Sequence, residues 1–243
     1  MTLAAPVPNR LFLFQKMAAP QQKLAVHMVR FDAARFDAGS FAAAGIDLPP
    51  AIARSVRKRQ AEFFHGRLCA RYALAALGAD QARVQPQVGI GSQRNPLWPR
   101  GVIGSISHSA THAAALVLPQ RGSEGIGIDI EMLGGLNDPA SLHLVFSAQE
   151  LEYLRTLDAE NGAGLYLTLA FSAKESFFKA AFHLVQKHFD FDVMEVVALD
   201  SARAVIVLEQ KKWLCSELPA GRRHLVQYTR LDAAQVITCC LLA

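Results

Sequence analysis

The sequence contains no apolar run long enough to cross a bilayer, so we expect no transmembrane segment. We also expect no secretory signal peptide, because the apolar run at residues 11–14 is short and follows Pro6 and Pro8. Charged residues are few, at 19%, and the mean hydropathy is +0.18, which excludes an intrinsically disordered chain. With 243 residues, 51% of them hydrophobic, the chain can bury a core as one large domain or two small ones.

Cysteines are scarce as well. The 4 cysteines show no Cys-x-x-Cys motif and no even spacing, so we expect neither a zinc site nor a disulfide framework. They are Cys69, Cys215, Cys239 and Cys240. Because disulfides are rare in the cytosol, this pattern predicts a reduced, cytoplasmic protein with buried thiols.

The net charge of +4 and the pI of about 9.0 conceal an uneven distribution of charge. Residues 51–100 hold nine lysines and arginines against two acids, whereas residues 121–160 hold two basic residues against eight acids. The first segment could attract anions and the second could hold a cation, or both could be solvated helix faces. Charge alone does not separate these interpretations.

The hydrophobic pattern predicts helices in both halves of the chain. Residues 51–77 have helical spacing, and Gly78 closes this helix. Its predicted core side holds Phe63, Leu68, Tyr72 and Ala75. A capping box of Ser147 and Glu150 predicts the start of a second helix, and a third is expected over residues 165–188.

Short strands are expected between and after these helices. The expected strands cover residues 24–31, 102–107, 113–118, 125–131, 193–199, 204–208, 225–229 and 236–242. Residues 86–101 are rich in proline and glycine and are expected to form a loop. This mixture indicates an α+β fold. Each half has a helical block followed by strands, which suggests two similarly built lobes, residues 1–120 and residues 121–243.

The segment GIGIDIE, residues 125–131, places two acids on one strand. Because side chains alternate along a strand, Asp129 and Glu131 face the same way, while Ile128 and Ile130 point into the core. Two carboxylates about 7 Å apart along a strand can hold one hard cation such as Mg²⁺. The two glycines leave space for a ligand or for another backbone. A solvent-facing strand with two acids is the plain alternative.

The segment FSAKESFFK, residues 171–179, lies on the third predicted helix. Glu175 and Lys179 are four residues apart and share a face, while Phe171, Phe178 and Phe182 are expected to pack inward. The pair could be an ordinary surface ion pair. It could also be a metal ligand or base beside an ammonium that neutralises a phosphate.

The segment GSISHS, residues 104–109, places a serine next to a histidine. Adjacent strand residues face opposite ways, so His108 is poorly placed to act as a base for Ser107, and a serine hydrolase is not favoured. The hydroxyl, imidazole and backbone N–H groups suit an anion such as phosphate. A serine-rich strand end without a function is the alternative.

Taken together, the basic helix and these three segments describe a site with anion contacts and a divalent cation, which a magnesium-bound diphosphate requires. The order GSISHS, GIGIDIE and FSAKESFFK resembles the 4′-phosphopantetheinyl transferases of the two-lobed surfactin-synthetase and enterobactin-synthetase type. KRQAEFFHGR (residues 58–67) and NPLWP (residues 95–99) are most similar to the enterobactin branch. The resemblance runs over residues 54–179, more than half of the chain.

The resemblance implies a monomer of two α+β lobes related by a pseudo-twofold axis, with the active site in the cleft between them. It implies transfer of the phosphopantetheine arm of coenzyme A to a serine of an apo acyl or peptidyl carrier protein, with release of adenosine 3′,5′-bisphosphate. Asp129, Glu131 and Glu175 match the Mg²⁺ ligands of the family. Glu175 also matches the proposed general base, and Lys179 matches a lysine near the diphosphate. Glu150 aligns with another acid, so either Glu150 or Glu175 could be the base.

The same resemblance implies a set of coenzyme A contacts. Ser107 and His108 match residues that contact the coenzyme, His108 at its 3′-phosphate. Lys58 and Arg59 lie where relatives place a basic contact. Arg94 lies near a position that relatives often fill with a lysine in a Gly-Lys-Pro sequence, where this chain has Arg-Asn-Pro.

Two other functions fit parts of the sequence. A nucleic-acid-binding module would explain the pI and the arginine-rich helix. The aromatic residues of that helix lie on its predicted core face, however, where they could not stack on bases, so we expect no nucleic-acid partner. A different magnesium-dependent phosphohydrolase or nucleotidyl enzyme would explain the acids and the anion contacts. Neither accounts for the order of all the motifs.

Overall fold

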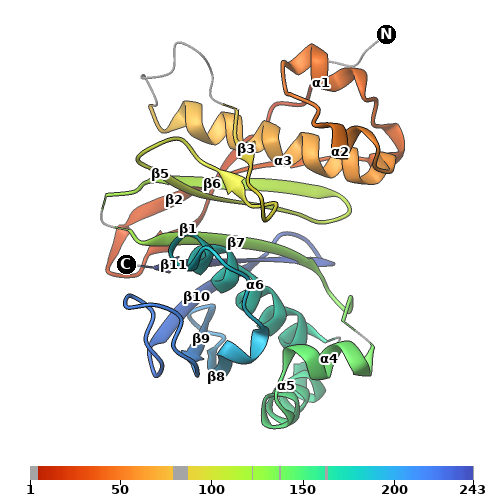
Figure 1. Ribbon diagram of the computed structural model, residues 1–243. Coiled ribbons are helices and arrows are strands. Elements are labelled where there is room, and N and C mark those ends of the chain that lie inside the picture. Colours follow the sequence, from red (N-terminus) through yellow and green to blue (C-terminus); the bar gives the residue numbers. More distant parts are fainter. Residues whose placement is uncertain (1–4, 79–86, 122, 137, 162–163, 243) are drawn as a thin grey trace. The chain divides into compact units, whose positions relative to one another are not determined.

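The computed structural model describes residues 5–78, 87–121, 123–136, 138–161 and 164–242, and the chain divides into two compact units (Figure 1). We call Met1–Arg121 unit 1 and Gly122–Ala243 unit 2. Both units combine helices with antiparallel strands, which confirms the mixed α and β structure predicted from the sequence. No helix in the described ranges is long and apolar enough to span a membrane.

Unit 1 is built on an antiparallel sheet with strand order β1-β2-β6-β5. The strands are β1 (Asn9–Lys16), β2 (Ala19–Arg30), β5 (Val102–His108) and β6 (His112–Pro119). The long helix α3 (Arg57–Ala76) packs on β2, β5 and β6. Shorter helical segments precede it: η1 (Ala33–Arg35), α1 (Gly39–Ala44) and α2 (Pro50–Ala53). Strand β1 was missed in the sequence, because its burial does not alternate regularly and a bulge interrupts its pairing with β2.

The helix predicted over residues 51–77 is two helices, so that prediction was wrong in detail. Helix α2 ends at Ala53 and α3 begins at Arg57. Side chains bond the carbonyl groups that this break frees: Gln60 Nε2 donates to the carbonyl oxygens of Ala53 and Ser55, at 3.0 Å each. These two hydrogen bonds stabilise the turn between α2 and α3, and hydrophobic periodicity does not reveal them.

The expected core face of α3 also needs correction. Phe63 and Leu68 are buried, but Tyr72 and Ala75 are exposed. The middle of the helix, residues 61–70, is buried on all sides, whereas residues in its first turn and its last turns are exposed. Within the expected loop, the part that the structure describes contains a small hairpin of β3 (Gly89–Ile90) and β4 (Pro96–Leu97).

Unit 2 is built on an antiparallel sheet with strand order β7-β11-β10-β9-β8. The strands are β7 (Gly125–Met132), β8 (Met194–Asp200), β9 (Val205–Gln210), β10 (Arg223–Arg230) and β11 (Gln235–Leu242). Helix α6 (Leu165–Val185) crosses the sheet, α5 (Ala148–Asn161) packs against α6, and η2 (Phe191–Val193) leads into β8. Helix α4 (Pro139–Val145) was not predicted. Its signals are Asp138, whose side chain accepts from the Ser141 N–H, and Pro139 in its first turn.

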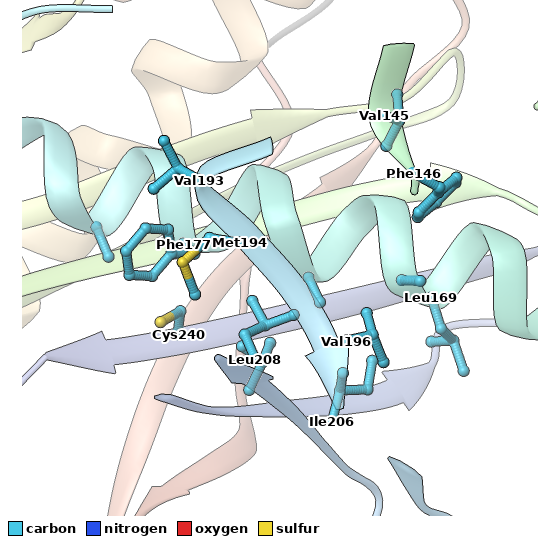
Figure 2. Close-up of a cluster of buried hydrophobic side chains, with 14 of the residues drawn as sticks. Val145, Phe146, Leu169, Phe177, Val193, Met194, Val196, Ile206, Leu208 and Cys240 are labelled. Atoms are coloured by element: carbon cyan, nitrogen blue, oxygen red, sulfur yellow. The ribbon is translucent and has the colours of Figure 1, made fainter. Parts of the chain in front are cut away.

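The core of unit 2 lies between α6 and the sheet (Figure 2). Phe177 of α6 is fully buried in this core, and its ring packs against His224 and Phe189. Phe182 is buried as predicted, and Phe171 is half-buried but packs against this core, whereas Phe178 is half-buried and is not part of it. All four cysteines are free, and three of them are buried, as predicted for the thiols.

Candidate active site

Strand β7 carries its two acids on the face that packs against α6. Gly125 and Gly127 share this face, and a Cβ atom on Gly127 would lie 1.8 Å from the backbone oxygen of Ser176. A Cβ atom on Gly125 would lie 2.1 Å from the oxygen of Ala180. The glycines therefore allow the α6 backbone to approach β7 closely. The isoleucines that alternate with them at positions 126, 128 and 130 are also buried.

This close approach brings Lys179 of α6 to Asp129 of β7. Lys179 Nζ lies 2.6 Å from Asp129 Oδ1 and 3.3 Å from the backbone oxygen of Ile128. Asp129 is buried, and Lys179 is partly buried. The alternative of a solvent-facing acidic strand is therefore wrong for Asp129. Lys179 forms an ion pair with Asp129 between helix and strand, and it also interacts electrostatically with Glu175.

The pKa values of the acids show that their charges are crowded. The pKa of Glu131 is raised to about 8, first by burial and then by the Asp129 carboxylate, which also shares a hydrogen bond with Glu131. Burial also raises the pKa of Glu175, although Lys179 opposes this shift. Burial alone would lower the pKa of Lys179, but the surrounding carboxylates outweigh it and raise that pKa. Asp129, Glu131, Glu175 and Lys179, which we call the acidic cluster, therefore form one electrostatically coupled group.

In the ranges that the structure describes, no three histidine, cysteine or acidic side chains are already arranged as a metal-binding group. The chemistry of the acidic cluster nevertheless suits a hard divalent cation, which takes carboxylate oxygens as ligands. Burial and then repulsion from Asp129 raise the pKa of Glu131, and a bound cation would oppose both effects because it favours the charged carboxylate. The donor set of Asp129, Glu131 and Glu175 thus fits Mg²⁺ in type and charge.

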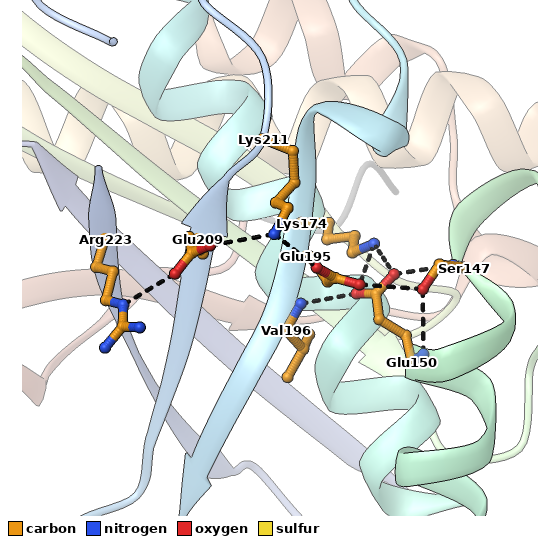
Figure 3. A network of polar contacts seen from close by, with 8 residues as sticks. All are labelled: Ser147, Glu150, Lys174, Glu195, Val196, Glu209, Lys211 and Arg223. Carbon is orange, nitrogen blue, oxygen red and sulfur yellow. Dashed lines mark hydrogen bonds and ion pairs between the residues drawn. The ribbon is translucent and has the colours of Figure 1, made fainter. Parts of the chain in front are cut away.

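Glu150, the other candidate base, is part of a buried polar network (Figure 3). The predicted capping box is confirmed: the Ser147 N–H donates to Glu150 Oε2 at 2.9 Å, and the Glu150 N–H donates to Ser147 Oγ at 3.1 Å. Lys174 Nζ lies 2.9 Å from the same carboxylate, and the Val196 N–H donates to its Oε1 at 2.7 Å. Both carboxylate oxygens are therefore engaged in holding α5, α6 and β8 together.

Lys174 itself was missed in the sequence. Its ammonium is buried, donates to the Val145 carbonyl at 2.8 Å and lies 5.0 Å from the centre of the Phe146 ring. Its position in an apolar stretch of helix was the available signal, since a buried lysine needs a partner. Around this pair the network extends to the surface through Glu195, Lys211, Glu209 and Arg223 (Figure 3).

Unit 1 holds a second cluster, which groups Lys58, Arg59 and His108 around Glu62. The Arg59 guanidinium donates to His108 Nε2 at 2.9 Å, and Glu62 Oε2 lies 3.3 Å from Arg59 and 3.9 Å from His108 Nδ1. Lys58 Nζ lies 4.0 Å from Glu62 Oε1. We call these four residues the basic cluster. Glu62 was not singled out in the sequence, although its spacing of three and four residues from two basic residues was a signal.

Two predicted coenzyme contacts are not part of the basic cluster. Ser107 is buried and alternates with His108 along β5, so its side chain lies on the opposite face of the strand. Arg94 is exposed in the turn between β3 and β4, where its φ of 64° is left-handed. The structure therefore separates these two residues from the three that it brings together.

The chain is similar to proteins of known function over most of its length. Residues 49–118 match the 4′-phosphopantetheinyl transferase N-terminal domain, and residues 125–239 match the 4′-phosphopantetheinyl transferase superfamily. Enterobactin synthase component D of Escherichia coli is 39% identical over 160 residues, which cover 64% of this chain and 70% of that protein. The same component of Salmonella typhi is 38% identical over 158 residues, 64% of this chain and 61% of that protein.

A third relative is a transferase by name. 4′-Phosphopantetheinyl transferase Svp of Streptomyces mobaraensis is 39% identical over 145 residues, which cover 60% of this chain and 57% of that protein. The match thus spans about three fifths of the length of the Salmonella and Streptomyces relatives. Both candidate clusters lie within the residues matched by the two family domains.

Proposed function

Because the chain belongs to the 4′-phosphopantetheinyl transferase superfamily, we propose that it transfers the 4′-phosphopantetheine arm of coenzyme A to a serine of an apo acyl or peptidyl carrier protein. The observation that carries this proposal is the acidic cluster, in which α6 brings Glu175 and Lys179 to the Asp-x-Glu strand. The second product is adenosine 3′,5′-bisphosphate. The names of the relatives favour a carrier protein of nonribosomal siderophore synthesis.

We further propose that the two units are the two lobes of this family, related by a pseudo-twofold axis, with the reaction in a cleft between them. The support is that each unit combines an antiparallel sheet with one long helix, α3 or α6. We also propose that the enzyme acts as a monomer in the cytoplasm, which agrees with its unpaired thiols.

The acidic cluster supplies the proposed chemistry. Asp129, Glu131 and Glu175 would hold Mg²⁺, which contributes positive charge that stabilises the leaving phosphate. The carrier serine oxygen attacks the phosphorus on the pantetheine side of the diphosphate, and the bond between that phosphorus and the bridging oxygen breaks. Glu175 accepts the serine proton, for which its raised pKa suits it. Lys179 keeps its charge beside the diphosphate, because the carboxylates raise its pKa.

Glu175 rather than Glu150 is the proposed base, because Lys174 and backbone N–H groups already occupy the Glu150 carboxylate. In unit 1, Lys58, Arg59 and His108 are proposed to bind coenzyme A phosphates, His108 at the 3′-phosphate. Their grouping around one buried carboxylate supports a shared anion site. For Ser107 and Arg94, contacts with the coenzyme rest on the family resemblance alone.

The test is incubation of the protein with Mg²⁺, coenzyme A and an apo carrier protein, followed by intact-protein mass spectrometry. We expect the carrier to gain the mass of one phosphopantetheine group. Asp129→Ala should lower turnover by on the order of 100-fold or more, whereas Ile130→Val should leave it unchanged. Equal turnover of Asp129→Ala and wild type at saturating Mg²⁺ would contradict the proposed site. Cleavage of coenzyme A without a carrier would indicate a phosphohydrolase instead.

A further inference from the structure

The Asp129 carboxylate is held at both of its oxygen atoms. Lys179 lies against Oδ1, and Ser172 Oγ donates to Oδ2 at 2.9 Å. Ser172 belongs to α6 and is fully buried. Asp129 Oδ1 therefore faces the ionisable residues of the acidic cluster, and Oδ2 accepts from a neutral, buried hydroxyl group.

Two more hydroxyl groups lie behind Ser172. Thr238 of β11 is the direct cross-strand partner of Asp129, so the two side chains share the face of the sheet that α6 covers. Thr238 Oγ1 lies 2.9 Å from Ser172 Oγ and donates to the Ser172 backbone oxygen at 2.8 Å. Ser176 Oγ, one helical turn after Ser172, contacts Thr238 Oγ1. All three hydroxyl residues have 0% exposure, so each depends on these bonds for polar partners.

The chemistry of the groups fixes the direction of this chain of hydrogen bonds. An ionised carboxylate only accepts, so Ser172 Oγ must donate its single proton to Asp129. Ser172 Oγ can then only accept from Thr238, whose proton is shared with the Ser172 backbone oxygen. Thr238 Oγ1 in turn accepts from Ser176. Ser172 is therefore the hydroxyl that donates to the Asp129 carboxylate, and Thr238 holds Ser172 at both its hydroxyl and its backbone oxygen.

We propose that Ser172 is a positioning residue for Asp129, with Thr238 and Ser176 supporting it. The hydroxyl chain fixes the rotation of the Asp129 carboxylate, so that Oδ2 faces the interior and Oδ1 remains with the acidic cluster. This inference rests on the proposed function, because it assigns the hydroxyl groups to the carboxylate that would bind Mg²⁺. Groups that orient a ligand in this way commonly change metal affinity by about 10-fold to 100-fold when they are removed.

A purely structural role is the rival explanation, and α6 offers a matched control. Thr168, one turn before Ser172, is also buried. Its hydroxyl donates to the Gly164 carbonyl at 2.8 Å and accepts from the Gly134 N–H at 3.4 Å, so its hydrogen bonds do not involve the acidic cluster. Thr168→Val removes a buried hydroxyl from the same helix, as Thr238→Val removes one from the facing strand.

The first experiment measures Mn²⁺ binding by electron paramagnetic resonance in the presence of coenzyme A. We expect Ser172→Ala and Thr238→Val to weaken Mn²⁺ binding by on the order of 10-fold, and Thr168→Val to leave it unchanged. Thr238→Ser should retain the affinity, because it keeps the hydroxyl, even though loss of its methyl group lowers the melting temperature. Thr238→Val keeps the shape of the side chain but removes the hydroxyl that Ser172 and Ser176 contact, so it should weaken Mn²⁺ binding and also lower the melting temperature.

The second experiment measures transfer to an apo carrier at varied Mg²⁺ concentration. The Ser172→Ala variant should need about 10-fold more Mg²⁺ for half-maximal rate, while the KM for coenzyme A at saturating Mg²⁺ stays at the wild-type value. Unchanged Mn²⁺ affinity in both Ser172→Ala and Thr238→Val would overturn the inference, as would an equal loss in Thr168→Val. A wild type that binds Mn²⁺ but modifies no carrier would overturn the proposed function instead.

Discussion

At the scale of single residues, His224 links the core of unit 2 to pH. Its ring packs against Phe177, and its Nε2 lies 3.3 Å from Gln210 Oε1. Burial lowers the pKa of His224 to about 4, and Arg222 adds to this effect. The unfolded chain therefore binds a proton between about pH 6.5 and pH 4 that the folded protein does not, so this residue destabilises the fold as the pH falls through that range.

We predict that the His224 contribution lowers the free energy of unfolding by about 2 kcal/mol between pH 7 and pH 5, because one pKa unit corresponds to about 1.4 kcal/mol. Urea unfolding of wild type and His224→Gln at both pH values measures it. The variant removes the titrating ring, so its stability should fall less between the two pH values, whatever its stability at pH 7. An equal fall in both proteins would contradict the lowered pKa.

Single residues also show what a sequence reveals and what it hides. Ser147 and Glu150 lie three positions apart, so local spacing alone predicted their capping box, and the structure confirms it. The alternation that puts Asp129 and Glu131 on one face is equally local. Thr238, by contrast, is 66 positions from Ser172, and only the pairing of β11 with β7 brings them together. Long-range contacts of this kind leave no periodic signal.

At the scale of elements, the contact between β7 and α6 depends on glycine. We predict that Gly127→Ala destabilises the protein by at least about 1–3 kcal/mol, because its Cβ atom would meet the backbone oxygen of Ser176 at 1.8 Å. A backbone atom cannot move aside without moving α6, so transfer activity should fall as well. The measurements are urea unfolding and carrier modification.

Gly89→Ala is the matched control for that substitution. Gly89 is also a strand glycine, but its added Cβ atom would lie 3.5 Å from Leu97 Cβ, an ordinary contact distance. We expect stability and activity close to those of wild type. If Gly127→Ala behaved like Gly89→Ala, the close approach of α6 to β7 would not constrain the fold.

The ion pair of Glu150 and Lys174 joins α5 to α6, and the Glu150 carboxylate also accepts from the Val196 N–H of β8. We predict that Lys174→Met costs about 3–5 kcal/mol of stability, because it leaves the Glu150 carboxylate buried without its cation. Arg203→Met is the control: it breaks the pair of Arg203 with Asp200, in which the two side chains are 83% and 43% exposed, and should cause no comparable loss. Similar unfolding curves for the two variants would show that the buried pair is not required.

Elements were predicted best where one side of the chain is apolar at a regular period. Strands β5 to β11 lie close to their predicted ranges. Regular alternation of apolar and polar residues, or a continuous apolar run, marks most of them in the sequence. Helix α4 is short, and its cap at Asp138 is its main signal. The division of the predicted helix into α2 and α3 depends on side chains bonding the freed carbonyl groups, which a hydrophobic pattern does not contain.

At the scale of the whole molecule, the lysines and arginines of residues 51–100, which we call the basic segment, have different roles in the structure. Arg67 and Arg71 donate to backbone carbonyl groups, so they serve the fold of unit 1. Lys58 and Arg59 join the basic cluster. Arg54 and Arg100 are exposed, and Arg83 lies outside the described residues. The excess of positive charge predicted from the sequence is thus divided between internal bonds, a proposed phosphate site and an exposed surface.

The exposed part of this charge leads to a prediction about carrier recognition. The carrier proteins that transferases of this family modify are expected to be acidic. Arg54 should therefore speed the association of the carrier with this protein through long-range electrostatic attraction. We predict that Arg54→Glu lowers kcat/KM for the carrier several-fold at low salt. This difference from wild type should disappear near 1 M salt, because the Debye length is then only about 3 Å. The KM for coenzyme A should stay unchanged.

Two further variants decide whether the location of the charge matters. Lys58→Glu should raise the KM for coenzyme A, because Lys58 lies in the basic cluster. Arg203→Glu changes the net charge by the same amount as Arg54→Glu. Arg203 lies in the turn between β8 and β9 of unit 2, outside residues 51–100, so this variant should leave the carrier kinetics unchanged. If Arg203→Glu slowed carrier modification as much as Arg54→Glu does, net charge alone would account for the steering. If kcat/KM for the carrier did not depend on salt in wild type or in either variant, the exposed arginines would have no part in carrier recognition. The basic segment would then serve only coenzyme A binding and the fold.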